Sequence, residues 1–151
     1  MSNSILRSQS KEFAKSIVLL CSRLKADRVE SALTNQLLRS GTSVGANIHE
    51  AQYAQGKKDF ISKFEIALKE CNETEYWLEL LFNTDSLSEE EFNTFRKSCI
   101  SLRRMLVSTV TTLKNKSRKE ENSDGMLFGS RSGSDRDDDR SQSDGKERAD
   151  D

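Results

Sequence analysis

The chain of 151 residues contains no proline, and its first 116 residues hold only three glycines. Proline removes a backbone donor and breaks a helix, and glycine weakens one, so this composition permits long uninterrupted helices. Apolar residues recur in the same stretch at steps of three and four positions, which is typical of one face of an amphipathic helix. The pattern predicts four helices, at about residues 4–25, 28–54, 57–82 and 89–116.

The residues between the predicted helices indicate how each helix begins and ends. Ser88 and Glu91 have the spacing of a capping box at the start of the fourth helix, and Leu87 and Phe92 stand at the positions of a hydrophobic staple. Gly56 is expected to end the second helix in a left-handed conformation. Because the connections are short, neighbouring helices should run antiparallel. The expected fold class is all-α, an antiparallel up-down-up-down four-helix bundle.

The composition changes near residue 117. Residues 1–116 hold 17 lysines and arginines and 14 acidic residues, whereas residues 117–151 hold 7 and 11, with seven serines and four glycines. A segment of the second kind cannot bury enough apolar surface to offset the entropy lost on ordering. We therefore predict a four-helix domain over residues 1–116 and a disordered acidic tail, rich in serine and glycine, over residues 117–151.

The third predicted helix is apolar on two sides. At 100° per residue, Phe64 marks the side that faces the core, and Ile66, Trp77 and Leu80 lie on the opposite side together with Glu73. One bundle cannot bury both sides, and a second apolar face favours contact with another subunit. We expect a homo-oligomer whose interface contains Ile66, Glu73, Trp77 and Leu80. The alternative is that Trp77 lies along the bundle edge, covered by a loop or by lysine stems.

A polar stripe follows the second predicted helix beside its apolar one. Its members recur at four-three-four-three spacing and are Gln36, Ser40, Ser43, Asn47 and Glu50. Small polar side chains let helices approach and form hydrogen bonds across the contact, and a buried amide without a partner costs about 1 to 3 kcal/mol. We interpret the stripe as setting the registry between helices. A contact with a ligand or with nucleic acid is the alternative.

Basic residues concentrate on the first and fourth predicted helices. Residues 4–25 carry five basic residues and one acidic residue, and residues 92–116 carry six basic residues and no acid, whereas residues 57–84 are acidic. The two basic helices would be neighbours in the bundle, so their charges could form one ridge suited to a phosphate backbone. No aromatic-basic motif for reading RNA is recognisable, and ordinary solvated side chains are the alternative. The predicted nucleic-acid-binding residues are Arg7, Lys11, Lys15, Arg96, Lys97, Arg103 and Arg104.

The sequence offers no pattern for catalysis or for binding a metal or cofactor. His49 is its one histidine, so the paired Glu-x-x-His motifs of a di-iron bundle are lacking, and no phosphate-binding glycine loop is recognisable. The three cysteines, Cys21, Cys71 and Cys99, fall on or beside apolar stripes, which favours core packing. We expect a protein that is not an enzyme and that holds no metal and no cofactor. Because no apolar run reaches about 18 residues and no secretory signal is recognisable, we expect no membrane association and a cytoplasmic location.

Two blocks of the sequence resemble a known bacterial family. They are the S-x-x-S-x-x-x-N-x-x-E-A pattern of residues 40–51 and the E-T-x-x-W-L pattern of residues 73–78. Over residues 4 to about 115 the chain is similar to the four helix bundle protein family, which includes proteins encoded in intervening sequences of 23S ribosomal RNA genes. The resemblance implies a ring-shaped homopentamer without established enzymatic activity. A more distant similarity, to the accessory protein of diversity-generating retroelements, implies binding of a reverse transcriptase and of nucleic acid through a basic surface.

The leading hypothesis is therefore a non-catalytic homo-oligomeric bundle, pentameric by the resemblance. It would associate through a basic surface with RNA or DNA, or with an enzyme that acts on nucleic acid such as a reverse transcriptase. The alternative is an oligomeric scaffold that binds only protein. The tail has no counterpart in the family pattern, so the resemblance implies nothing about it.

Overall fold

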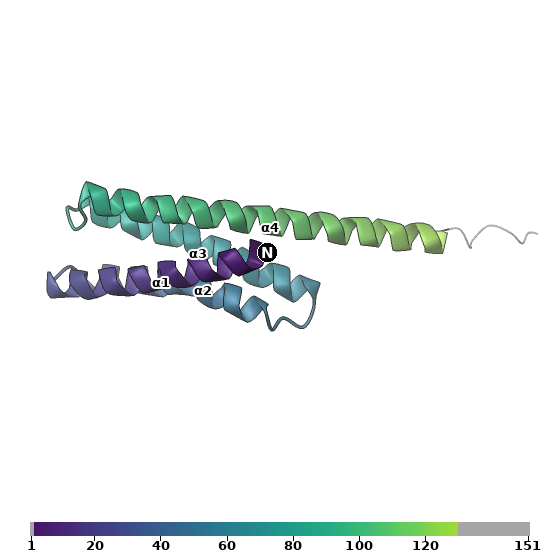
Figure 1. Ribbon diagram of the computed structural model, residues 1–151, viewed down its shortest axis with the longest axis horizontal. Coiled ribbons are helices and arrows are strands. Elements are labelled where there is room, and N and C mark those ends of the chain that lie inside the picture. The colour runs from purple at the N-terminus through teal and green to yellow at the C-terminus, as the bar shows by residue number, and fades with distance from the viewer. Residues whose placement is uncertain (1, 130–151) are drawn as a thin grey trace, which may run out of the picture. The chain divides into compact units, whose positions relative to one another are not determined.

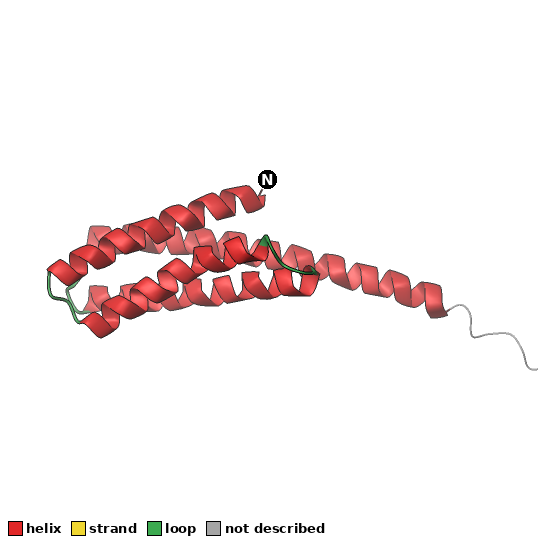
Figure 2. Cartoon of the chain, turned by 90° about the horizontal axis from the view of Figure 1, so that it is seen from below, coloured by secondary structure: helices red, strands yellow, loops and turns green. Residues whose placement is uncertain are grey.

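The computed structural model describes residues 2–129, and this part of the chain is built from four α-helices without any strand (Figure 1). The helices of residues 2–117 lie side by side, and because the connections are short, consecutive helices run in opposite directions (Figure 2). This arrangement confirms the all-α four-helix bundle. The helices are α1 (Ser2–Ala26), α2 (Ser31–Ala51), α3 (Lys57–Asn83) and α4 (Glu89–Gly129).

The predicted apolar stripes meet in one core. Phe64 of α3 is fully buried and belongs to one cluster with leucine, isoleucine and valine side chains of the other helices. Taking one such side chain out of water stabilises the fold by roughly 1.5 to 3 kcal/mol. The largest fully buried apolar side chains are Leu6, Ile17, Leu24, Leu37, Val44, Ile48, Phe64, Leu78, Leu81, Leu102 and Leu106.

The ends of α1 and α3 both turn through a residue with positive φ that is not glycine. Arg28 has a φ of 59° after α1, and Asp85 has a φ of 61° after α3. After α1, the Val29 amide donates to the Leu24 carbonyl at 3.0 Å. After α3, the Ser86 amide donates to the Leu81 carbonyl at 2.8 Å. These are the bonds of a Schellman motif, which satisfies the last carbonyls of a helix and reverses the chain.

The capping box at the start of α4 is confirmed. The Glu91 amide donates to the Ser88 hydroxyl at 3.1 Å, and the Ser88 amide donates to the Glu91 carboxylate at 3.2 Å. Leu87 and Phe92 are both buried, as a hydrophobic staple requires. The ring of Phe92 also stacks on Phe82 of α3, with 4.5 Å between centroids, so the cap is tied to the α3–α4 contact.

The prediction for Gly56 is wrong. Its φ of −176° and ψ of 176° are those of extended backbone, and it precedes α3 instead of ending α2. α2 ends earlier, at Ala51, and the connection to α3 is stabilised by a side chain of α3. There the Gln55 amide donates to the Asp59 carboxylate of α3 at 3.3 Å. The side chain that shapes this turn therefore comes from the helix that follows it.

The fourth helix is longer than predicted. α4 continues to Gly129, so the expectation of disorder from residue 117 onward is wrong for residues 117–129. Extending an existing helix needs no new nucleus, and the arginine, lysine and glutamates after Ser117 are good helix formers. Residues 130–151, the rest of the predicted tail, lie outside the described part. The chain divides into two units, residues 1–117 and 118–151, and the bundle core belongs to the first.

Candidate nucleic-acid interface

Two glycines of α2 allow α1 and α2 to approach closely. A Cβ atom added at Gly41 would lie 2.8 Å from Cγ2 of Ile17, and one added at Gly45 would lie 3.2 Å from the carbonyl oxygen of Ser10. Glycine spaced four residues apart puts both positions on the side of α2 that meets α1. Because side chains at this crossing are small, they do not fill the outer side of the contact.

A groove with a volume of about 750 Å³ lies along this contact. On α1 it is lined by Arg7 and Lys11, with serine hydroxyls between them, and on α2 by Thr42 and His49. Two of the predicted cations therefore share one concave surface with the exposed hydroxyl of Ser8, whereas the hydroxyls of Ser10 and Thr42 donate to carbonyls of their own helices. Lys15, one turn after Lys11, is exposed on the same helix and does not line the groove.

The cations of the groove keep their charge uncompensated. Within residues 2–129 no carboxylate lies within ion-pair distance of Arg7, Lys11 or Lys15. The carboxylate that lines the groove belongs to Glu50, and its Oε2 atom lies 3.1 Å from Nζ of Lys63 on α3. An anion that entered the groove would thus meet two available cations and a carboxylate that is already paired.

The structure does not bring all seven predicted cations together. Arg96 and Arg103 of α4 face α3, where both pair with Glu75; the Arg96 contact measures 3.8 Å. The hydrogen bond with Glu75 raises the pKa of Arg103. Lys97 and Arg104 are exposed on α4, and no described carboxylate pairs with them. One continuous ridge over the first and fourth helices stays a prediction, and within it part of the α4 charge is shared with a carboxylate of the acidic α3.

The residues predicted to contact another subunit lie along α3. Trp77 is half-buried against the core, and its Nε1 atom donates to Glu73 at 3.2 Å. Glu73 also pairs with Arg39 of α2, and this hydrogen bond lowers the pKa of the carboxyl group. Ile66 is 38% exposed and Leu80 is half-buried. Within one protomer the indole thus lies on the α2–α3 edge, and the subunit contact stays a prediction.

The polar stripe of α2 lies toward α3. Ser40 is buried, and the Thr74 hydroxyl of α3 donates to its Oγ atom at 3.0 Å. The Asn47 side-chain amide donates to the Ser43 carbonyl at 2.8 Å, so it has a partner within its own helix. Gln36, at the other end of the stripe, is exposed. Thr74 was not predicted as the partner of Ser40. Its position directly after Glu73, with a hydroxyl on the apolar side of α3, is the sequence feature that could have indicated this contact.

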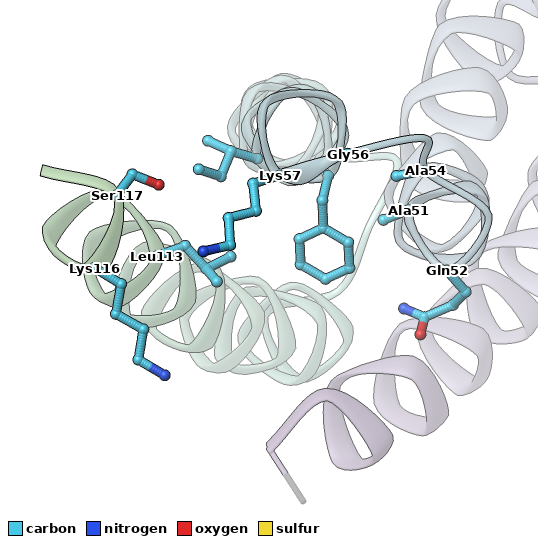
Figure 3. A pocket seen from close by; sticks show the side chains of 10 residues that line it. Ala51, Gln52, Ala54, Gly56, Lys57, Leu113, Lys116 and Ser117 are labelled. Carbon is cyan, nitrogen blue, oxygen red and sulfur yellow. The ribbon is translucent and has the colours of Figure 1, made fainter. Parts of the chain in front are cut away.

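A second, smaller cavity of about 360 Å³ lies beside the α2–α3 connection. The side chains of Ala51, Lys57 and Leu113 surround it, and Lys57 extends toward Leu113 (Figure 3). None of the residues predicted to be functional lines this cavity. Among the described residues, no cluster of histidine, cysteine and carboxylate side chains could hold a metal ion. The same part of the chain has no helix with both the length and the apolar character of a membrane span.

The family resemblance of the two motif blocks is supported by similarity to known proteins. Residues 2–108 match the family described as 23S rRNA-intervening sequence protein. The chain belongs to this family. A solved structure that it resembles is a protein of unknown function from the S23 ribosomal protein family of Bacteroides thetaiotaomicron, with 43% sequence identity and a TM-score of 0.72. The match covers 74% of this chain and 99% of that one. No curated protein matches the chain.

Proposed function

We propose that this member of the 23S rRNA-intervening sequence protein family is a non-catalytic, self-associating bundle that binds nucleic acid through α1 in the cytoplasm. The observation that carries the proposal is the contrast between two sets of cations. Arg96 and Arg103 are paired with Glu75, whereas Arg7, Lys11 and Lys15 of α1 have no carboxylate partner among the described residues. Lys97 and Arg104 of α4 are unpaired as well, but only Arg7 and Lys11 of these cations line the groove between α1 and α2. Charge that is not used inside the protein is available for a phosphate backbone.

Phosphate contacts of this kind attract nucleic acid without reading its sequence. Of the five basic residues of α1, Arg23 pairs with Asp27 and Glu91, but Arg7, Lys11 and Lys15 remain without a described partner, so this side of α1 favours any polyanion. Each cation that neutralises a phosphate releases a counterion, and the affinity should therefore fall steeply as salt rises. The Bacteroides relative belongs to a family named for the ribosome, and we take RNA as the first probe.

Self-association would multiply the cationic surface. On the outer side of α3, Ile66 is 38% exposed, beside the half-buried Trp77. The family resemblance implies five subunits, that is, a homopentamer. A Trp77→Glu variant should lower the particle mass in light scattering, with Glu79→Gln on the same helix as its control. An unchanged mass would remove Trp77 from the subunit contact.

Charge reversal locates the nucleic-acid surface. The double variant Arg7→Glu/Lys11→Glu should lose most binding to a structured RNA, measured by filter binding at about 50 and 200 mM salt. The variant Lys97→Glu/Arg104→Glu changes the charge equally on α4 and should keep more of the affinity, since these residues do not line the groove between α1 and α2. Absence of wild-type binding at both salt concentrations, or equal losses in the two variants, would contradict the proposal.

The second candidate is a scaffold that binds only protein. The observation in its favour is the exposed apolar side chains on α3, which would suit a partner helix as well as a second copy. A pull-down after thorough nuclease treatment separates the two functions. Only the scaffold should keep its partners, whereas a reverse transcriptase held through nucleic acid should be lost.

A further inference from the structure

An aromatic pair stands at the end of the cationic groove. His49 lines the groove, and the ring of Tyr53, one turn further along, lies 5.6 Å from the imidazole ring at an angle of 58°. Tyr53 is 77% exposed, so most of its ring remains in water. Arg7 and Lys11 line the same groove from α1. One aromatic ring, His49, therefore shares the groove with two cations that lack carboxylate partners among the described residues, and the exposed ring of Tyr53 lies against that histidine.

We propose that this groove is a binding site for single-stranded nucleic acid. Arg7 and Lys11 would hold the phosphates, and Tyr53 with His49 would stack on a base. This inference rests on the proposed function, because it uses cations of the same surface, and it adds the class of nucleic acid. It also gives a use to an exposed aromatic ring that the bundle core does not need.

The chemistry of the groove fits a single strand better than a duplex. Bases in a duplex are stacked on both faces and offer no free π-face, whereas an unpaired base can stack on an aromatic side chain. The exposed hydroxyl of Ser8 also lines the groove and can donate to phosphate or sugar oxygens. Along α1 the lining runs from Ser4 to Ala14, which is about 15 Å of helix and suits a short stretch of strand.

The location of the aromatic pair can be tested with matched tyrosines. Tyr53→Leu removes the ring at the groove, and Tyr76→Leu removes an exposed ring from α3, on the other side of α2 from the groove. Tyr53→Phe keeps the stacking face and removes only the hydroxyl. Because Tyr53 and Tyr76 are both exposed, neither leucine variant should disturb the core.

The probes are fluorescein-labelled oligouridylate and oligothymidylate of about 12 nucleotides, and a duplex of the same length, added to the full chain. Fluorescence anisotropy should show that Tyr53→Leu weakens binding of both single strands by roughly 5- to 100-fold. Duplex binding by this variant should stay near that of the wild type. Tyr53→Phe and Tyr76→Leu should bind single strands within about twofold of the wild type, since stacking at the groove is kept.

Two results would separate this inference from the proposed function. If duplex and single strands bind equally, and Tyr53→Leu has no effect while Arg7→Glu/Lys11→Glu still weakens binding, the single-strand site is wrong and the cationic surface remains. If neither these probes nor the structured RNA bind at about 50 or 200 mM salt, both proposals fall. A loss in Tyr76→Leu equal to that in Tyr53→Leu would also overturn the location of the site.

Discussion

Arg103 of α4 forms an ion pair with Glu75 of α3, and this contact joins two helices of opposite charge. Arg96 reaches the same carboxylate, and Lys114 of α4 lies 2.5 Å from Glu65 of α3. The basic character of α4 is therefore partly matched by the acidic character of its neighbour. For this reason the net charge of a helix does not by itself tell which of its cations can meet a ligand.

The first prediction concerns the stability that this ion pair provides. Arg103→Gln should lower the free energy of unfolding by about 1 kcal/mol, because the side chains of Arg103 and Glu75 are 33% and 22% exposed and partly shielded from water. Arg104→Gln, at an exposed position without a described partner, should change it by less than about 0.5 kcal/mol. Urea unfolding followed by circular dichroism measures both. Equal losses in the two variants would show that the pair contributes nothing specific.

The second prediction concerns the close approach of α1 and α2. Gly41→Ala should lower the free energy of unfolding, because the new methyl group would meet the stiff side chain of Ile17 at a cost of about 1 to 3 kcal/mol. This loss should exceed the gain of about 1 kcal/mol that alanine gives in a helix. Gly125→Ala in α4 is the control, since no atom lies within 4 Å of the added carbon there.

Thermal or urea unfolding of the two alanine variants tests this contact. Removing the obstructing side chain as well, in Gly41→Ala/Ile17→Ala, should cost less than the sum of the single changes, since residues in contact are not additive. A Gly41→Ala protein as stable as the wild type would mean that α1 and α2 can separate without loss.

The third prediction concerns acid. The hydrogen bond from Arg39 lowers the pKa of Glu73 below its ordinary value of 4.5; burial opposes the shift and the Trp77 indole adds to it. Since the unfolded chain then binds more protons than the folded one in acid, this contribution is present above about pH 4.5 and is lost as the pH falls further. Glu73→Gln should therefore lose less stability than the wild type between about pH 5 and pH 3.

Urea unfolding at several pH values tests the role of Glu73, with Glu79→Gln as a variant of an exposed glutamate on the same helix. The Glu79→Gln profile should run parallel to that of the wild type. If the Glu73→Gln profile did so too, the contact with Arg39 would have no part in acid stability.

The fourth prediction concerns the three thiols. Cys21, Cys71 and Cys99 are all buried, so a reagent reaches them only when the fold opens locally. Burial raises the pKa of Cys21, and the hydrogen bond with Cys71 together with burial raises the pKa of Cys99, whereas the hydrogen bond with Cys99 lowers the pKa of Cys71. A thiol with a raised pKa forms little of the reactive thiolate. Ellman's reagent should react slowly with the folded protein and rapidly with all three thiols in urea. Fast reaction of one thiol in the folded state would reveal local opening of its helix.

Much of the fold was predictable because it depends on local patterns. The spacing of apolar residues located the four helices, and Ser88 with Glu91 located the start of α4, since a capping box needs only residues close in the chain. Gly56 was misread because its turn is held by Asp59 from the next helix. The end of α4 was misread because composition favoured disorder where an existing helix could simply continue.

The candidate site was less predictable, although its residues were visible. Arg7, Lys11 and Lys15 stood out by charge, but so did Arg96 and Arg103, which the structure pairs with Glu75. The prediction that α1 and α4 are neighbours is confirmed, because Arg23 of α1 pairs with Glu91 of α4 at 2.6 Å. The rotation of each helix about its own axis places other cations of the same two helices toward α2 and α3.

The sequence by itself determined the number of helices, their apolar faces, and membership in a family, because helix periodicity and motif spacing are properties of neighbouring residues. Only the tertiary structure decided which cations are paired and which remain available, and that His49 lines the same groove as Arg7 and Lys11. The reason is physical. Whether a charge is compensated depends on groups on another helix, and their positions follow from how the helices pack and rotate against each other.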